Sequence, residues 1–218
     1  MGTCPLEVRA APGRHLLRLR LEEPGGTYLA YEARVEVGEG GLGAFTAELL
    51  RYDPRGEALK GGKGLVYALA YGPKGVLALG DAAGQVRLLL PGRPPLDLKG
   101  HASYVRDLAF SPDGRYLAVG SADGGVRLLD LLAPGGPEPQ LLYAHKDLPL
   151  GLAFSPDGRY LASGGQDREV RLYDLEAGLL ERVYVGHTGA VYGLDFNPQT
   201  PALATGGGEG RVLLFRLP

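Results

Sequence analysis

The four histidines of the chain carry the side chains best suited to hold a metal ion, and they are His15, His101, His145 and His187. A zinc site takes three or four ligands, which often come in closely spaced pairs. No two of these histidines stand at such a spacing. All but His15 precede the first strand of a repeated unit at the same phase. We therefore predict structural histidines and no metal site.

A second pattern that could do chemistry is the G-x-G-x-x-G stretch from Gly38 to Gly43. In a dinucleotide-binding fold such a stretch is followed, about 20 residues on, by an acidic residue at the end of a second parallel strand. Position 63 is Lys63, and the downstream motifs of a protein kinase are missing from the sequence. We interpret the stretch as a hairpin loop between strands and predict no cofactor.

Paired carboxylates would suit glycoside hydrolysis, in which two acids converge on one bond. Asp107 and Asp195 lie in corresponding segments, but Asp195 aligns with Ala109 and not with Asp107. The sequence indicates no converging pair and no Ser-His-Asp arrangement. We therefore predict that the protein is not an enzyme.

The elements that would position these residues are repeated. Similar stretches begin at Gly61, Gly100, Ala144 and Gly186. Each alternates apolar and polar residues in short segments, which is typical of β-strands. Turn residues such as Pro112-Asp113-Gly114 separate the segments. Four antiparallel strands in roughly 40–45 residues is the pattern of a β-propeller blade.

The N-terminal part follows the same phase with less similarity. We predict strands over 15–21, 27–37 and 44–53 and a fourth over 57–60, which together make a divergent blade. The last repeat has three strands before Pro218. The alternating segment 6–10 is predicted to supply its fourth strand and to close the ring. The sequence thus predicts one domain, a closed propeller of five four-stranded blades, divided as 6–10, 15–60, 61–99, 100–143, 144–185 and 186–218.

Composition narrows the class of protein further. The net charge is −2 and the pI is about 6.1, which argues against nucleic acid as the partner. The single cysteine, Cys4, permits no intrachain disulfide. The sequence shows neither a secretory leader nor an apolar run that could cross a membrane, so we expect a cytoplasmic protein. The scarcity of thermolabile side chains suits a thermophile, although a GC-rich genome would produce the same bias.

These repeats resemble WD40 repeats, through the Gly-His start, the Phe-Ser-Pro-Asp-Gly turn and the Val-Arg-Leu-x-Asp strand. The resemblance covers residues 61–218 well and 6–60 only by phase. It implies a buried tetrad of His, Ser or Thr, Asp and Trp in each blade. No tryptophan is present. The positions that match carry structural roles under this resemblance: His101, Asp123, His145, Ser163, Asp167, Tyr173, His187, Thr205 and Glu209.

The resemblance also implies a non-catalytic platform that binds a protein partner on the face where the inner strands begin. The matching positions are Leu65, Tyr67, Tyr104, Arg106, Leu148, Leu150, Gln166 and Tyr192. Aromatic and arginine side chains are frequent in binding hot spots. Tyr67 and Tyr192 could instead simply plug the central channel. Two other functions stay open: a propeller enzyme acting on glycans, and a subunit that completes its ring with another chain, including a homo-oligomer.

Overall fold

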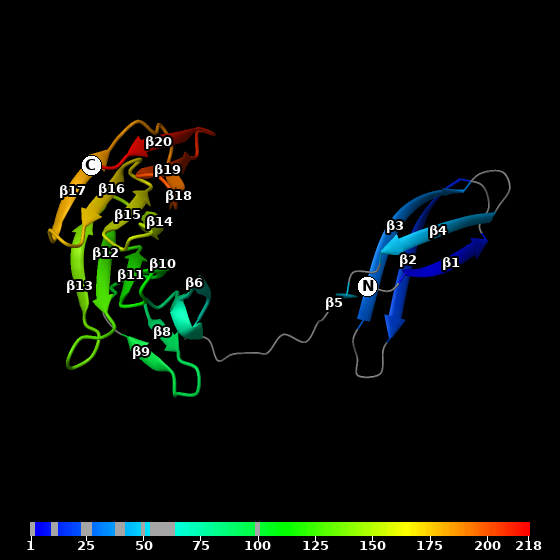
Figure 1. Cartoon of the computed structure of the whole chain (residues 1–218), viewed down its shortest axis with the longest axis horizontal. Coiled ribbons are helices and arrows are strands. Elements are labelled where there is room, and N and C mark those ends of the chain that lie inside the picture. Colours follow the sequence, from blue (N-terminus) through cyan, green and yellow to red (C-terminus); the bar gives the residue numbers. More distant parts are fainter. Residues whose placement is uncertain are drawn as a thin grey trace. The chain divides into compact units, whose positions relative to one another are not determined.

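The computed structural model describes residues 64–98 and 101–218, together with the backbone of five strands nearer the N-terminus (Figure 1). The chain divides into two compact units, Met1–Leu59 and Lys60–Pro218. The sequence predicts a single domain over both units.

Four antiparallel sheets form the second unit, and within every sheet the strands follow one another in chain order. The first sheet contains β6 (Val66–Tyr71), β7 (Leu77–Asp81), β8 (Val86–Leu89) and β9 (Leu96–Leu98), with the short 3-10 turn η1 (Pro73–Gly75) before β7. The second contains β10 (Val105–Phe110), β11 (Tyr116–Ser121), β12 (Gly125–Asp130) and β13 (Pro139–Ala144). The third contains β14 (Pro149–Phe154), β15 (Tyr160–Gly165), β16 (Val170–Asp174) and β17 (Leu179–Tyr184). The fourth contains β18 (Val191–Phe196), β19 (Ala202–Gly207) and β20 (Val212–Arg216).

The turn between the first two strands of the third sheet shows how the Ser-Pro-Asp-Gly residues fix its shape. Gly158 has a φ of 75°, a left-handed conformation that favours glycine. The Ser155 hydroxyl oxygen accepts a hydrogen bond from the backbone N–H of Tyr160 at 2.8 Å. The Asp157 carboxylate accepts one from the N–H of Arg159 at 3.1 Å. The Ser-Pro-Asp-Gly sequence thus fixes the direction in which the second strand leaves.

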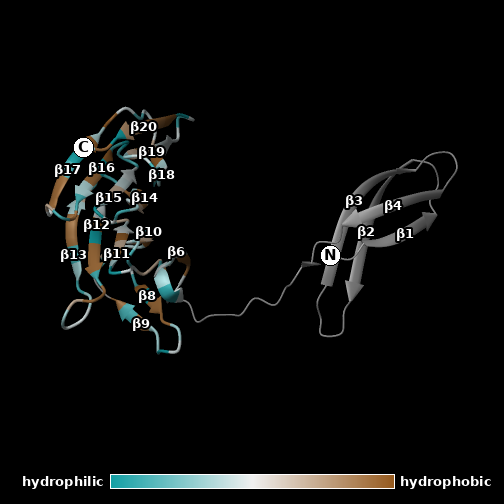
Figure 2. Ribbon diagram, viewed as in Figure 1, coloured by the Kyte–Doolittle hydropathy of each residue, from teal (hydrophilic) through white to brown (hydrophobic). Residues whose placement is uncertain are grey.

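The apolar core lies between successive sheets. Three clusters of buried side chains each join one sheet to the next, so every internal sheet has an apolar neighbour on both faces. Leu117, Leu161 and Leu203 are among the fully buried side chains at these junctions. The inner strands β6, β10, β14 and β18 contact one another in that order (Figures 1 and 2). The sheets therefore stack as blades around a common side lined by the inner strands.

Close approach between sheets depends on a glycine in the second strand. A methyl group on Gly164 would lie 2.6 Å from Cγ1 of Val191 in the next sheet. Gly80 and Val105 meet in the same way between the first and second sheets. A glycine faces the next inner strand because any larger side chain would hold the two sheets apart.

The first unit has strands close to the predicted positions, but they pair differently. Its strands are β1 (Thr3–Arg9), β2 (Gly13–Glu22), β3 (Tyr28–Val37), β4 (Leu42–Glu48) and β5 (Arg51–Tyr52). β1 pairs with β4, and β3 lies between β2 and β5. This order is not the consecutive one of a blade.

The N-terminal strand therefore does not complete the fourth sheet, and this part of the prediction is wrong. β1 forms seven residue pairs with β4, which is much nearer along the chain than β20. Pairing nearby strands closes a shorter loop and costs less chain entropy. In the described part of the chain the fourth sheet has three strands. The predicted strand over 57–60 and most of the Gly38–Gly43 loop lie outside the described residues. No helix among the described residues could span a membrane.

Candidate functional site

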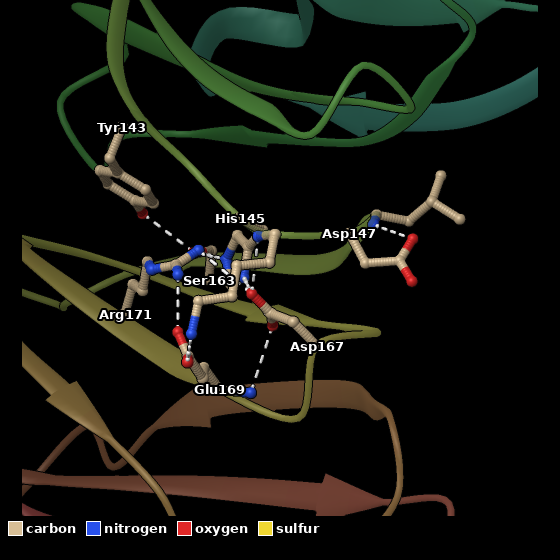
Figure 3. Close-up of polar contacts among 9 residues, drawn as sticks. Tyr143, His145, Asp147, Ser163, Asp167, Glu169 and Arg171 are labelled. Atoms are coloured by element: carbon tan, nitrogen blue, oxygen red, sulfur yellow. Dashed lines mark hydrogen bonds and ion pairs between the residues drawn. The ribbon is translucent and has the colours of Figure 1, made fainter.

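The most complete polar cluster is built on the third sheet, around His145 (Figure 3). His145 lies just before β14, where its side chain is buried. Its Nδ1 is 2.9 Å from Oδ1 of Asp167, and its Nε2 is 2.7 Å from Oγ of Ser163. Gly165 makes room for the cluster, since a methyl group there would collide with the imidazole and the carboxylate.

The direction of each hydrogen bond follows from the chemistry of the groups. An ionised Asp167 only accepts, so Nδ1 of His145 carries the proton and Nε2 accepts from the Ser163 hydroxyl. Burial lowers the pKa of His145, and the hydrogen bond to Asp167 only partly opposes this. Burial alone would raise the pKa of Asp167, but the bond from His145 and the backbone N–H of Lys146 bring it below its usual value. The pair is therefore a neutral imidazole held by a carboxylate.

A tyrosine that sequence reasoning missed completes this cluster. The Tyr143 hydroxyl donates to Oγ of Ser163 at 3.0 Å, and its ring lies 5.8 Å from that of Tyr173. Tyr143 belongs to β13, the outer strand of the preceding sheet. The expected fourth member, Tyr173, is buried beside it and contributes its ring. The only sequence signal for Tyr143 is its position in the outer strand of a repeat. The sequence pattern of that strand varies most from one repeat to the next.

We expect Tyr143→Phe to lower the free energy of unfolding by about 1 kcal/mol, because one hydrogen bond in a buried network is lost. Tyr173→Phe keeps the ring and serves as the matched control, with a smaller effect. Urea denaturation of the two variants measures both values. A larger loss in Tyr173→Phe would show that the two tyrosines have been assigned the wrong roles.

The fourth sheet repeats this arrangement with other residue types. Nδ1 of His187 is 2.5 Å from Oε1 of Glu209, and Nε2 is 2.7 Å from Oγ1 of Thr205. Glu209 also accepts from the backbone N–H of Gly189 at 3.0 Å. The hydrogen bond from His187 is the main reason that the pKa of Glu209 lies below its usual value. The structure thus brings together the three residues predicted for this repeat.

The second sheet does not form the predicted pair. Neither ring nitrogen of His101 has a hydrogen-bond partner among the residues that the structure describes. Burial, assisted by the charge of Arg127, lowers the pKa of His101 to about 4. Asp123 instead pairs with Arg127, whose Nη2 lies 2.8 Å from Oδ2. The prediction that His101 and Asp123 form a structural pair is wrong.

Three neighbouring positions explain this failure. Gly125 stands where the third sheet has Glu169, which takes the corresponding arginine, Arg171, at 2.6 Å. Arg171 also lies 3.3 Å from Asp167, but its shorter ion pair is with Glu169. Arg127 has no such glutamate at position 125 and pairs with Asp123 at 2.8 Å. Val119 replaces the hydroxyl of Ser163, and Ser121 replaces the glycine that makes room for the imidazole. Each change could be read from the sequence once the competition for the carboxylate was considered.

The ring nitrogens of His145 and His187 are occupied by other side chains. Both nitrogens of His145 and of His187 are used in hydrogen bonds to neighbouring side chains. Across residues 64–98 and 101–218, no three His, Cys, Asp or Glu side chains come together as a metal site would require. The geometry supports the structural interpretation of these two residues.

Asp107 has a role between sheets. Its carboxylate accepts from the backbone N–H of Leu152 in β14 at 2.8 Å and from that of Leu108 at 2.9 Å. Burial raises its pKa, and these hydrogen bonds only partly compensate. The side chain thus ties one inner strand to the next, and Asp195, which is exposed, takes no part in this contact.

The predicted docking positions are held by a repeated backbone contact. In each sheet, the residue just before the inner strand accepts a hydrogen bond from the residue that follows the second strand. The carbonyl of Tyr104 accepts from Ala122 at 2.9 Å, and that of Leu148 accepts from Gln166 at 2.8 Å. The carbonyl of Leu65 accepts from Ala82 at 2.8 Å. These contacts place the predicted positions Leu65, Tyr104, Leu148 and Gln166 on the corresponding edge of their sheets.

Aromatic rings gather on this edge. The rings of Tyr67 and Tyr104 lie 5.3 Å apart between centroids. Tyr192 packs over Gly208, where a methyl group would lie 3.0 Å from the ring. Tyr67 is 50% exposed and Tyr192 is 61% exposed in the stack of four sheets. We call the eight predicted positions the docking face: Leu65, Tyr67, Tyr104, Arg106, Leu148, Leu150, Gln166 and Tyr192.

The sheets and their clusters define a class of protein: consecutive antiparallel sheets stacked by their faces, with inner strands adjoining, are the blades of a β-propeller. The family model described as "WD domain, G-beta repeat" matches residues 92–130, 137–174 and 178–216, more than half of the chain. The chain belongs to the WD40 repeat family.

Each matched repeat begins in the outer strand of one sheet and ends in the third strand of the next. Among solved structures, the chain is similar to the computationally designed Ika4 protein. The two are 25% identical with a TM-score of 0.63, over 74% of this chain and 96% of that one. No curated protein sequence matched the chain. WD40 repeats generally serve as protein-interaction scaffolds and typically lack enzymatic activity.

Proposed function

We propose that this protein is a non-catalytic platform that binds a protein partner on the docking face. The observation that carries the proposal is the pair of partly exposed rings of Tyr67 and Tyr104, 5.3 Å apart, with the carbonyl of Tyr104 held by the N–H of Ala122. Rigid aromatic side chains bury a large area at a low cost in conformational entropy. Arg106 lies two residues from Tyr104 and adds a cation that can stack on a partner's ring.

The chemistry of the site favours binding over catalysis. The buried histidines are engaged in structural hydrogen bonds or, at His101, are held neutral by burial. Asp107 is occupied by two backbone donors. The cavity beside the Ser155–Tyr160 turn and Asn197–Pro201 brings no second Asp or Glu to Asp157, which weakens the alternative of a glycan-active enzyme. We place the protein in the cytoplasm, and we do not expect nucleic acid or a membrane as its partner.

The double variant Tyr104→Ala and Arg106→Ala tests this function. Hot-spot truncations cost about 2 kcal/mol or more, so the partner recovered from the native host should be lost. Asp113→Ala with Asp157→Ala, on the turns at the opposite ends of the inner strands, is the control and should retain it. Thermal melting confirms that both variants stay folded. Retention by the first variant and release by the second would place docking on the other face.

A further inference from the structure

Each of the three junctions between successive sheets pairs one face of a sheet with the opposite face of the next. The first and the fourth sheets each leave one of these two faces exposed. In the first three sheets, one face receives the next sheet through matching alanine, valine and leucine positions in the second and third strands. These side chains are buried in every case: Ala78, Val86 and Leu88; Ala118, Val126 and Leu128; Ala162, Val170 and Leu172. We call this the receiving face.

The fourth sheet has the same receiving face, but no other sheet of the second unit covers it. Val212 is 71% exposed and Leu214 is 75% exposed, although both occupy positions that are buried in the other sheets. Gly206 corresponds to Gly80 and Gly164, which the following sheet contacts closely. A methyl group on Gly206 would meet only the carbonyl oxygen of Gly193, at 4.0 Å.

The first sheet exposes the complementary surface. In later sheets the inner strand inserts into the receiving face before it through side chains such as Val105 and Leu108, which are buried. Their counterparts in β6, Val66 and Leu69, are 41% and 63% exposed. We call this the inserting face. It ends at Tyr71, which is also exposed, in the place of Phe110, Phe154 and Phe196.

We propose that a second copy of this chain covers these ends, with the inserting face of one copy seated on the receiving face of the other. A second copy carries the missing counterpart residue for residue, with Val66 opposite Gly206 as Val191 lies opposite Gly164. Contacts between different patches of identical chains generate closed rings when the rotation allows. Two copies contribute eight sheets, within the usual range of four to eight blades, whereas three copies would exceed it.

The N-terminal unit of the same chain is a weaker occupant. Its strands pair as β1 with β4 and as β2, β3 and β5, and not as a consecutive four-stranded blade. A blade needs that order to present both an inserting and a receiving face. The proposal also stands apart from the docking face, because it uses the flat faces of the end sheets and different residues.

Light scattering after gel filtration, applied to the full chain over a range of concentrations, tests the proposal. We expect a mass twice the 23.0 kDa of one chain. Gly206→Val should give a folded monomer, since its new side chain meets open space within one chain and blocks Val66 of the other. Leu214→Arg should do the same. Leu141→Arg, at an exposed leucine of the outer strand β13, is the matched control and should stay dimeric.

Mixing variants tests the head-to-tail arrangement. Leu69→Arg removes the inserting face and Leu214→Arg the receiving face, so each alone is monomeric. An equal mixture retains one intact interface and should form pairs again. The proposal fails if the wild type is monomeric at every concentration, if the dimer survives both Gly206→Val and Leu214→Arg, or if the mixture stays monomeric. Circular dichroism shows that each variant is folded, and partner binding by the docking face is scored separately.

Discussion

Replacing His145 with alanine is expected to lower the free energy of unfolding by about 3 kcal/mol. The change leaves the Asp167 carboxylate, of which 4% of the side chain is exposed, without the N–H of the imidazole. It also leaves the buried hydroxyl of Ser163 without its acceptor. Breaking a buried pair by removing one member costs more than the pair contributes, because the remaining group keeps its desolvation penalty.

Urea denaturation followed by circular dichroism measures this loss. Asp167→Asn, which keeps the shape of the side chain, and the double variant with His145→Ala complete a cycle that isolates the coupling between the two residues. Asp113→Ala, in an exposed turn, is expected to cost much less. Tight, stoichiometric zinc binding by the wild type that disappears in His145→Ala would show that the histidine is a metal ligand after all.

Replacing His101 with leucine is expected to stabilise the protein, by about 1–2 kcal/mol at neutral pH. The imidazole is buried with both nitrogens unpartnered among the described residues, and an apolar side chain of similar size removes that penalty. The gain should increase in acid. The folded pKa of His101 is about 4, below the ordinary value of 6.5. The unfolded chain therefore binds a proton between these values and the folded chain does not.

Above pH 6.5 the imidazole is neutral in both the folded and the unfolded chain, and the linkage costs no stability. As the pH falls from 6.5 toward 4, the unfolded chain binds the proton first and the wild type loses stability. At pH 4 this linkage amounts to about 3 kcal/mol in the wild type, and His101→Leu should lack it. Denaturation midpoints of both proteins from pH 7 to pH 4 give the comparison. His145, whose pKa is also lowered by burial, leaves a smaller acid sensitivity in both. Parallel curves for the two proteins would show that His101 is exposed or paired in solution.

The repeats made much of the second unit predictable. Alternation and the Pro-Asp-Gly turns placed its strands, and the common phase of the histidines correctly joined His145 to Ser163 and Asp167. The same phase misled at His101, because pairing there depends on which acid Arg127 prefers, and Gly125 leaves it only Asp123. The repeat period assigns each residue its position in the blade. It does not show whether the histidine or the neighbouring arginine pairs with the aspartate.

The pairing of the first unit could not be predicted for a different reason. Alternation identifies a strand and the side that it buries, but it does not name the strand's partner. The segment 6–10 fits either an unfilled edge in the fourth sheet or β4, and the structure selects β4. Tyr143 was missed because it comes from the sheet before the one it serves.

The offset between repeat and sheet has a consequence for how such chains grow in evolution. A duplicated segment equal to one repeat would supply the outer strand of the sheet before it and three strands of a new sheet. The sheet after the new one would then pack against the same kind of face as before the duplication. Every sheet inside the stack would still have its four strands, so no strand edge would be left unpaired there. Recombination between repeats in the gene can therefore change the number of blades. The apolar surface that stays uncovered is then confined to the first and last sheets.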